Sequence, residues 1–303
     1  MKRRTFLQGS AGLAAAAFAS PLLGDSERIT GIQKSGFFKI SLAQWSLHRQ
    51  LRSGALKVLD FPIKAKNTFA IDAVEYVNQF FSDKARDRKF LADLKARATD
   101  HGVTSLLIMV DAEGDLGNLD KNERRQAVEN HFQWVEAAKY LGCHSIRVNA
   151  GGQGSSDEVR KACTVGLRAL AEFAQDFDID IVVENHGGYS SNGLWLSQLL
   201  REVDMPNCGS LPDFGNFGEY DRYLGVQQLM PFARGISAKS FSFDEKGNEV
   251  NTDFARMLRI IRDAGYKGYI GIEYEGSGDE DWGIKATQKL LLSLSQQLEL
   301  PTG

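Results

Sequence analysis

The chain has 303 residues, 25% of them charged, and a formal net charge of −3 at pH 7. It holds 36 Lys and Arg against 39 Asp and Glu, with no basic cluster beyond its first residues, so it lacks the electrostatic footprint of a nucleic-acid-binding protein. Its three cysteines are few and form no C-x-x-C pair, so we expect buried free thiols and no disulfide framework.

Residues 1–24 have the pattern of a twin-arginine export signal. Arg3 and Arg4 precede an Ala-rich apolar run, Phe6–Ala19, which ends in the A-x-A cleavage site Ala17–Ala19. The alternative is a membrane anchor, but this run is shorter than the ~20 apolar residues that a spanning helix needs. We therefore expect an exported, periplasmic protein without stable membrane insertion.

After a polar connector, residues 25–36, strand-like and helix-like patterns alternate through residues 37–303. The apolar runs start roughly 25–40 residues apart, a spacing that holds a strand, a helix and two loops. These runs are Phe38–Ala43, Ile71–Val77, Val103–Val110, Ser145–Asn149, Ile179–Val183, Cys208–Leu211, Gly235–Lys239 and Tyr269–Tyr274. Amphipathic windows between them, such as Arg88–Thr99 and Val128–Leu141, predict helices.

Eight strand–helix units in strict alternation predict a closed (β/α)8 TIM barrel of α/β class in a single domain. An open doubly wound sheet is the alternative, but no G-x-G-x-x-G turn follows the first strand. In a barrel, the carboxyl ends of the strands form the active site. The polar residues expected there are Glu75, Asn78, Asp111, Arg147, Asn149, Glu184, His186, Asp213, Ser237, Lys239, Glu273 and Glu275.

Three acidic residues stand out, because Glu184, Asp213 and Glu273 lie at the ends of the fifth, sixth and eighth strands and so converge in one mouth. Carboxylates crowded in a partly dry cavity repel one another unless a cation lies between them. A divalent ion such as Mg²⁺ or Mn²⁺ suits oxygen ligands, and Arg147 and Lys239 are the alternative counter-charges. Each carboxylate taken alone is equally well explained as a cap or a rim salt bridge.

Four motifs in chain order resemble the strand ends of the xylose-isomerase-like superfamily of sugar isomerase and epimerase barrels. They are Val-Val-Glu184-Asn-His186, Pro-Asp213-Phe-Gly-Asn216, Ser237-Ala-Lys239 and Ile-Gly-Ile-Glu273-Tyr-Glu-Gly. The resemblance covers essentially the whole mature chain. It implies one divalent metal ion held by Glu184, Asp213 and Glu273, with both glutamates also acting as acid and base on opposite faces of the substrate carbon.

The sequence departs from the family pattern at two positions. Ser237 stands where the family has a histidine ligand, and Asn216 stands where the family often has a second histidine. A hydroxyl is a poorer ligand than an imidazole, so the fourth metal position falls to water, substrate or His186. In the alternative, the metal has been lost and Lys239 occupies the place of the cation.

The resemblance implies a metal-assisted sugar isomerase or epimerase that works through an enediolate. Its catalytic residues would be Glu184, Glu273 and Lys239, although Lys239 in a merely structural pair with Glu273 is the simpler interpretation. Trp45 and Phe214 are the aromatic candidates for stacking on a sugar. The expected substrate-binding residues are His186, Arg147, Asn149, Asn216 and Glu75.

Two other functions remain open. A lyase or hydratase acting on 3-keto-glycosides would begin with the same proton abstraction, and a non-catalytic barrel would bind carbohydrate without turnover. Because an exported enzyme is unsuited to sugar phosphates, a free sugar or glycoside is the expected small-molecule partner. The sequence leaves open whether the chain forms a homo-oligomer.

Overall fold

The computed structural model describes residues 36–299, and both the expected export signal and nearly all of the connector after it lie outside this part. Its strands are β1 (Lys39–Ala43), β2 (Ala73–Val77), β3 (Thr104–Met109), β4 (Ser145–Asn149), β5 (Asp180–Glu184), β6 (Cys208–Leu211), β7 (Ile236–Ser240) and β8 (Tyr269–Tyr274). Its α-helices are α1 (His48–Ser53), α2 (Phe61–Phe69), α3 (Arg88–Asp100), α4 (Lys121–Leu141), α5 (Ser156–Gln175), α6 (Gly193–Val203), α7 (Arg222–Leu229), α8 (Phe254–Asp263) and α9 (Glu280–Glu299).

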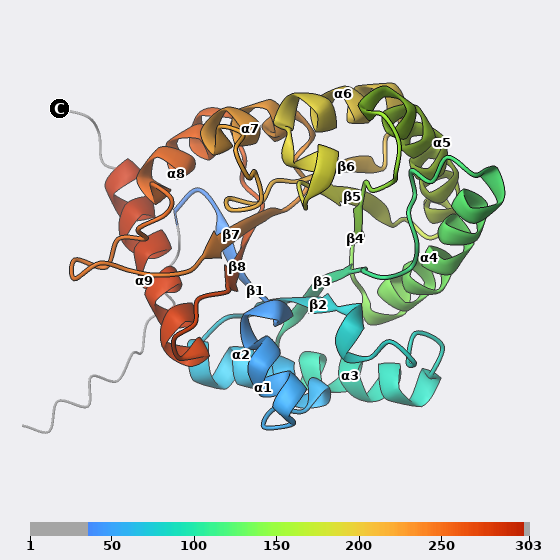
Figure 1. Ribbon diagram of the computed structural model, residues 1–303. Coiled ribbons are helices and arrows are strands. Elements are labelled where there is room, and N and C mark those ends of the chain that lie inside the picture. Colours follow the sequence, from blue (N-terminus) through green and yellow to red (C-terminus); the bar gives the residue numbers. More distant parts are fainter. Residues whose placement is uncertain (1–35, 300–303) are drawn as a thin grey trace, which may run out of the picture. The chain divides into compact units, whose positions relative to one another are not determined.

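The eight strands form one parallel sheet in the order β6-β5-β4-β3-β2-β1-β8-β7. Its two end strands meet through two isolated parallel bridges among the described residues, Ser210–Ala233 and Asp213–Ser237. The sheet therefore curls into a barrel, with the helices on its outside (Figure 1). The predicted single-domain (β/α)8 fold is confirmed, and the seam between β6 and β7 is its least hydrogen-bonded junction.

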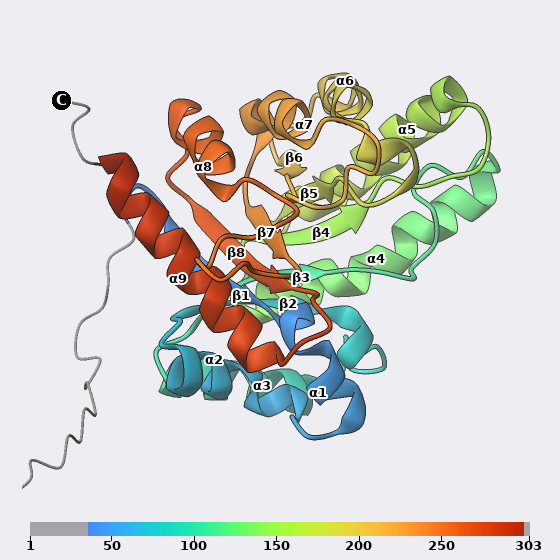
Figure 2. The same ribbon diagram turned by 60° about the vertical axis from the view of Figure 1, so that its left-hand side comes forward.

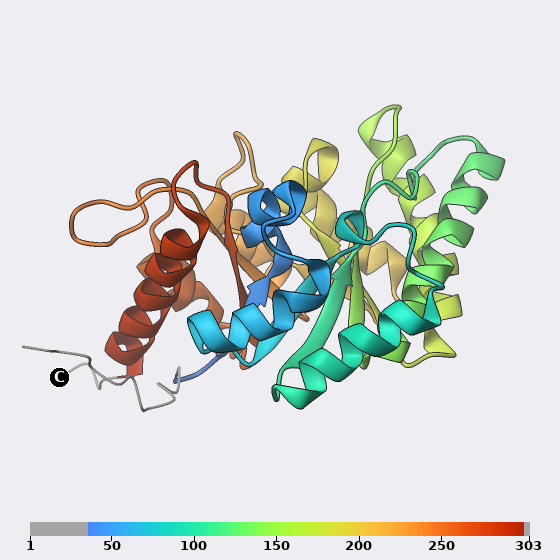
Figure 3. The ribbon, with the colours of Figure 1, turned by 90° about the horizontal axis from the view of Figure 1, so that it is seen from below.

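The helices cover the outer face of the sheet in chain order. Figure 2 shows α8 and α9 beside β7 and β8, and Figure 3 shows α9, α2 and α3 along the lower side of the barrel. Helices α2 and α9, from the beginning and the end of the chain, are in contact there. Lys64 Nζ of α2 lies 2.7 Å from Asp281 Oδ2 of α9, and Gln288 of α9 donates to the carbonyl of Phe69 of α2. Within residues 36–299, no helix is long and apolar enough to cross a membrane.

Local sequence signals explain where the helices begin and end. Ser155 and Glu158 form a capping box at the start of α5. Asp253 caps α8, and Gly142 in the left-handed conformation ends α4. The amphipathic pattern missed α1, α2 and α7, which have six, nine and eight residues and are too short to show a clear period.

Alternation along the strands divides the barrel residues into an outer and an inner set. Leu42, Tyr76 and Ile108 point outward into the large core beneath the helices. The residues between them point inward, and the apolar ones form a separate small core. This inner core consists of Ala43, Val77, Leu107, Met109, Val182 and Leu211. Ser237 and Lys239 of β7, Glu273 of β8 and the last residues of β4 and β5 are polar and point inward, so one part of the interior is apolar and the other is charged.

Candidate active site

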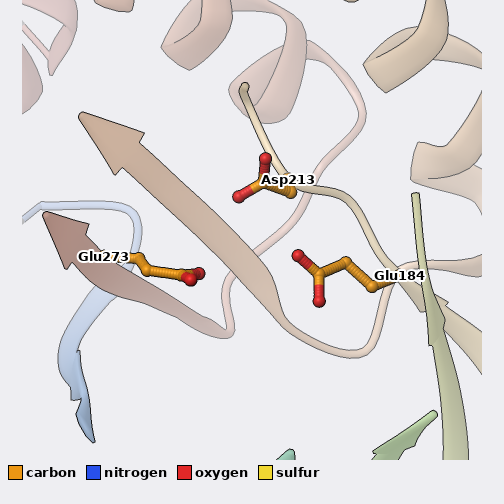
Figure 4. A group of neighbouring side chains, drawn as sticks. All are labelled: Glu184, Asp213 and Glu273. Carbon is orange, nitrogen blue, oxygen red and sulfur yellow. The ribbon is translucent and has the colours of Figure 1, made fainter. Parts of the chain in front are cut away.

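The structure brings Glu184, Asp213 and Glu273 together at the carboxyl ends of their strands. Each offers a carboxylate oxygen, these oxygens all lie within 4.8 Å of one another, and all three residues are buried. Figure 4 shows their carboxylate groups directed toward a common space from three sides. We call these three residues the acid cluster.

Asp213 is fixed by the backbone around it. Its Oδ1 atom accepts hydrogen bonds from the amides of Gly215 and Asn216, both at 2.8 Å. The amide of Asp213 donates to Asn185 Oδ1, and Asn185 Nδ2 donates back to the carbonyl of Asp213. Asn185 was not among the predicted site residues, because alternation turns it away from the barrel interior, yet it ties β5 to the loop that carries Asp213.

Glu184 is held from two sides. Its Oε1 atom accepts a hydrogen bond of 3.1 Å from Asn216 Nδ2, and its Oε2 atom lies 2.8 Å from Arg147 Nε. Burial raises the pKa of Glu184 to about 7, because it outweighs the opposing effect of Arg147. Arg147 in turn donates to Asp111 Oδ1 at 2.6 Å, and although burial alone would raise the pKa of Asp111, that guanidinium lowers it to about 2.

Glu273 has a different environment. Its Oε2 atom accepts a hydrogen bond of 2.7 Å from Ser237, and its Oε1 atom lies 3.4 Å from Lys239 Nζ. Burial would raise the pKa of Glu273, but Lys239, the Ser237 hydroxyl and Arg147 together hold it below its ordinary value. Burial would likewise lower the pKa of Lys239, but the surrounding carboxylates raise it well above the ordinary value. Lys239 is therefore a buried ammonium group.

The acid cluster fits a divalent metal ion. Asp213 Oδ2 is buried and has no hydrogen-bond partner among the described residues, which leaves it free to bind a cation. No His or Cys joins the cluster in the described part of the chain, so every protein donor is an oxygen, and such sites suit Mg²⁺ or Mn²⁺. Burial and the neighbouring glutamates raise the pKa of Asp213 to about 7, although Lys239 opposes them, which is the repulsion that a bound cation relieves.

Glu75 lies deeper in the barrel than the sequence indicated. Ser41 donates to its Oε1 atom at 2.6 Å, while Oε2 is buried and has no hydrogen-bond partner within residues 36–299. Gly271 makes room for this carboxyl group, since a Cβ atom at that position would lie only 2.6 Å from Oε1. Burial raises the pKa of Glu75 to about 7.

The other predicted contact residues occupy different places. Asn149 donates to Asp111 Oδ1 at 2.8 Å, so its amide group belongs to the Arg147 network. His186 is exposed at the rim, where partial burial and the cations Arg147 and Lys239 lower its pKa. Phe214 is fully buried with its ring edge against Phe254, so the expectation that it stacks on a sugar is wrong.

The three cysteines match the expectation of buried free thiols only in part. All are free thiols, and Cys143 and Cys163 are buried. Burial raises the pKa of Cys208, which is partly exposed, to about 12. None of them therefore offers a thiolate to the site at neutral pH.

Residues 64–294 match the family model described as the xylose isomerase-like TIM barrel. This match covers well over half of the chain, so the protein belongs to the xylose isomerase-like TIM barrel family. The family resemblance predicted from the four motifs is confirmed.

Two curated proteins share short segments with the chain. A segment of 55 residues is 38% identical to the C-glycoside deglycosidase alpha subunit of Arthrobacter globiformis, and it covers 18% of this chain and 16% of that protein. A segment of 62 residues is 37% identical to the 3'-dehydrocarminate deglycosidase alpha subunit of a Microbacterium species, and it covers 20% of this chain and 18% of that protein. The chain thus matches only a small part of the length of either relative.

Solved structures match the fold over most of the chain. The IOLI protein with a bound zinc atom has a TM-score of 0.70 at 13% identity, with 86% of this chain and 99% of that chain covered. The 3-keto-D-glucoside 4-epimerase YcjR from E. coli has a TM-score of 0.64 at 15% identity, with 85% and 99% covered. A xylose isomerase-like barrel from Mycobacterium smegmatis in complex with magnesium has a TM-score of 0.64 at 14% identity, with 86% and 97% covered.

Proposed function

We propose that the protein is a sugar isomerase or epimerase that moves a proton at the carbon atom next to a carbonyl group. The observation that carries this proposal is the placement of Glu184 and Glu273, which approach one space from β5 and β8 with Asp213 between them (Figure 4). Two carboxylates on opposite sides of a substrate carbon allow one to remove a proton and the other to return it.

The environments of the two glutamates favour different roles. Glu273, beside Lys239 and Ser237, stays ionised and is suited to act as the base. Glu184 is suited to return the proton, to the same carbon in an epimerase and to the neighbouring carbon in an isomerase. Arg147 and Lys239 stabilise negative charge that develops on the carbonyl oxygen.

The acid cluster would hold a divalent ion of the Mg²⁺ or Mn²⁺ class. Such an ion supplies Lewis-acid polarisation of a carbonyl group. Asn216, bound to Glu184, and His186 at the rim are placed to contact sugar hydroxyls. If the chain is exported, as residues 1–24 suggest, free sugars and glycosides are better substrate candidates than sugar phosphates.

A second candidate is elimination from a keto-glycoside. The segments shared with two deglycosidase alpha subunits and the fold shared with a 3-keto-D-glucoside epimerase support it. The base would remove the proton next to the ketone, and the electron pair of that C–H bond would form a double bond as the bond to the aglycone breaks. The departing aglycone oxygen or carbon would take a proton from a protonated carboxyl group or water.

The test follows solvent deuterium into a panel of free ketoses and 3-keto-glycosides. We expect exchange by the wild-type protein and a loss of about 10²–10⁴-fold in Glu184→Gln and Glu273→Gln, the usual contribution of a positioned acid or base. Glu202→Gln, which changes a glutamate on the outer surface at 41% exposure, is the matched control. Unchanged exchange in both site variants would exclude the mechanism.

The products distinguish the remaining functions. An epimer or isomer with the glycosidic bond intact supports the leading proposal, whereas release of the aglycone supports elimination. Sugar binding without exchange for any member of the panel would favour a non-catalytic binding barrel.

A further inference from the structure

An aromatic pair covers the apolar part of the barrel interior. Trp45 lies in the 3-10 helix η1 (Gln44–Leu47) directly after β1, and Phe80 lies in η3 (Asn78–Phe80) directly after β2. Their ring centroids are 5.8 Å apart, and both side chains pack on the inner core while remaining partly exposed. The pair therefore presents aromatic surface at the same end of the barrel as the acid cluster.

The indole ring of Trp45 is held in one orientation. Its Nε1 atom donates to Glu275 Oε1, His48 stacks on it at a centroid distance of 5.2 Å, and the Arg52 guanidinium lies 4.8 Å from its centre. Glu275 also lies 3.2 Å from Lys239 Nζ, which contacts Glu273 of the acid cluster. One acidic side chain thus connects the aromatic pair to the charged part of the mouth.

A second chain of contacts runs around the other side of the mouth. Gln79, the neighbour of Phe80, donates to Asp111 Oδ2 at 3.0 Å. Asp111 pairs with Arg147, and Arg147 pairs with Glu184. The aromatic pair and the acid cluster are therefore joined on both sides, so a molecule that enters the mouth meets charge on one side and aromatic rings on the other.

We infer that Trp45 and Phe80 bind the aglycone of a glycoside, and that this aglycone is a flat, apolar group such as an aromatic ring. The inference rests on the proposed function, because the acid cluster must take the sugar. A free sugar that fills the charged side leaves this aromatic surface in contact with water, whereas an aryl group attached to the sugar covers it. Aromatic groups packed on each other stabilise a complex beyond the effect of the area they bury.

The test compares binding of phenyl β-glucoside and methyl β-glucoside, two non-reacting probes, to the full-length protein by isothermal titration calorimetry. We expect the phenyl glycoside to bind about tenfold more tightly, which corresponds to ~1.4 kcal/mol. Trp45→Ala and Phe80→Ala should each reduce this preference by several-fold, because they weaken binding of the phenyl glycoside more than binding of the methyl glycoside. Trp282→Ala is the matched control, since Trp282 belongs to a separate aromatic pair with Phe243 and is 54% exposed.

Trp45→Phe separates the loss of aromatic surface from a disruption of the fold, because it keeps an aromatic ring but lacks the N–H group that binds Glu275. Retained preference in this variant supports the inference. Equal affinity of the wild-type protein for both glycosides, or an unchanged preference in the Trp45→Ala/Phe80→Ala double variant, overturns the inference alone. Failure of the wild-type protein to bind either glycoside also overturns the inference, whereas the proposed function is decided separately by deuterium exchange into the ketoses and 3-keto-glycosides.

Discussion

The Nζ atom of Lys239 lies 3.4 Å from Oε1 of Glu273, with 3% and 6% of the two side chains exposed. The same ammonium group lies 3.2 Å from Glu275 Oε2, so it pairs with two carboxylates at the edge of the acid cluster. Lys239 is thus a built-in cation next to a site that suits a metal ion. The ammonium group of Lys239 and a bound metal ion are expected to act on the same carboxylate oxygens.

Replacing Lys239 with methionine tests whether Lys239 and a metal ion compensate the same carboxylates. Because removal of one partner leaves buried carboxylates without compensation, Lys239→Met should lower the free energy of unfolding by about 3–5 kcal/mol. Added Mn²⁺ should then raise the Tm of the variant more than that of the wild-type protein. Thermal unfolding with and without MnCl₂ measures both effects. Lys139→Met, which breaks an exposed pair with Asp178, is the control and should cost less than ~1 kcal/mol. Equal Mn²⁺ shifts in variant and wild type would contradict the shared role.

The choice of metal is predicted to depend on Ser237. Its hydroxyl donates to Glu273 Oε2 at 2.7 Å, and an imidazole at this position would add the nitrogen ligand that zinc favours. We expect Ser237→His to raise the affinity for Zn²⁺ relative to Mn²⁺ by at least about tenfold, since soft or borderline ligands shift selectivity. Competition calorimetry measures the ratio, and Asp213→Asn should weaken binding of both ions. An unchanged ratio would show that residue 237 does not reach the ion.

Glu75 predicts a pH dependence of stability. Its carboxyl group keeps its proton up to about pH 7 in the folded barrel and ionises near its ordinary value of 4.5 in the unfolded chain. The contribution of Glu75 to the free energy of unfolding is therefore complete below pH 4.5. It is lost as the pH rises through 7, by up to about 3 kcal/mol. Glu75→Gln should remove this loss, so the variant gains stability over the wild type at pH 8 but not at pH 4.5. Chemical unfolding at several pH values tests this, and parallel curves for the two proteins would contradict it.

Asn185 is predicted to position Asp213 without contacting a ligand itself. Asn185→Ala removes two hydrogen bonds, of 2.8 and 3.0 Å, from a fully buried site. We expect a loss of about 2–3 kcal/mol in unfolding free energy and a weaker affinity for Mn²⁺. Asn207→Ala, which removes two side-chain hydrogen bonds to the carbonyls of Ala171 in α5 and Ile179 just before β5, should cost stability without changing the Mn²⁺ affinity. Equal effects of both variants on Mn²⁺ binding would assign Asn185 a general structural role.

The fold could be predicted because each buried strand is a continuous apolar run. β4, β6 and β8 have the expected limits, and the others differ by one or two residues at either end. The helix periodicity was equally informative for α3, which was expected over Arg88–Thr99. It failed for α1, α2 and α7, because one or two turns of helix bury too few residues to show a period.

The site could be predicted only in part. Position at a strand end was enough to bring Glu184, Asp213 and Glu273 together, because parallel strands of a barrel share one carboxyl end. The partners of these acids depend on register and on side-chain length, which a sequence does not reveal. The contact of Ser41 with Glu75, for example, requires that residue 43 pairs with residue 75 across β1 and β2.

The junction between β6 and β7 relates the site to the closure of the barrel. Asp213 and Ser237 form one of its two bridges in the described chain, and Ser237 also holds Glu273. A metal ion or substrate bound by both Asp213, next to β6, and Glu273, on β8 beyond β7, would connect the two sides of this weakly hydrogen-bonded junction. Binding of such a ligand would then slow amide hydrogen exchange in β6 and β7. The same carboxylate groups would thus serve both the chemistry and the closure of the barrel.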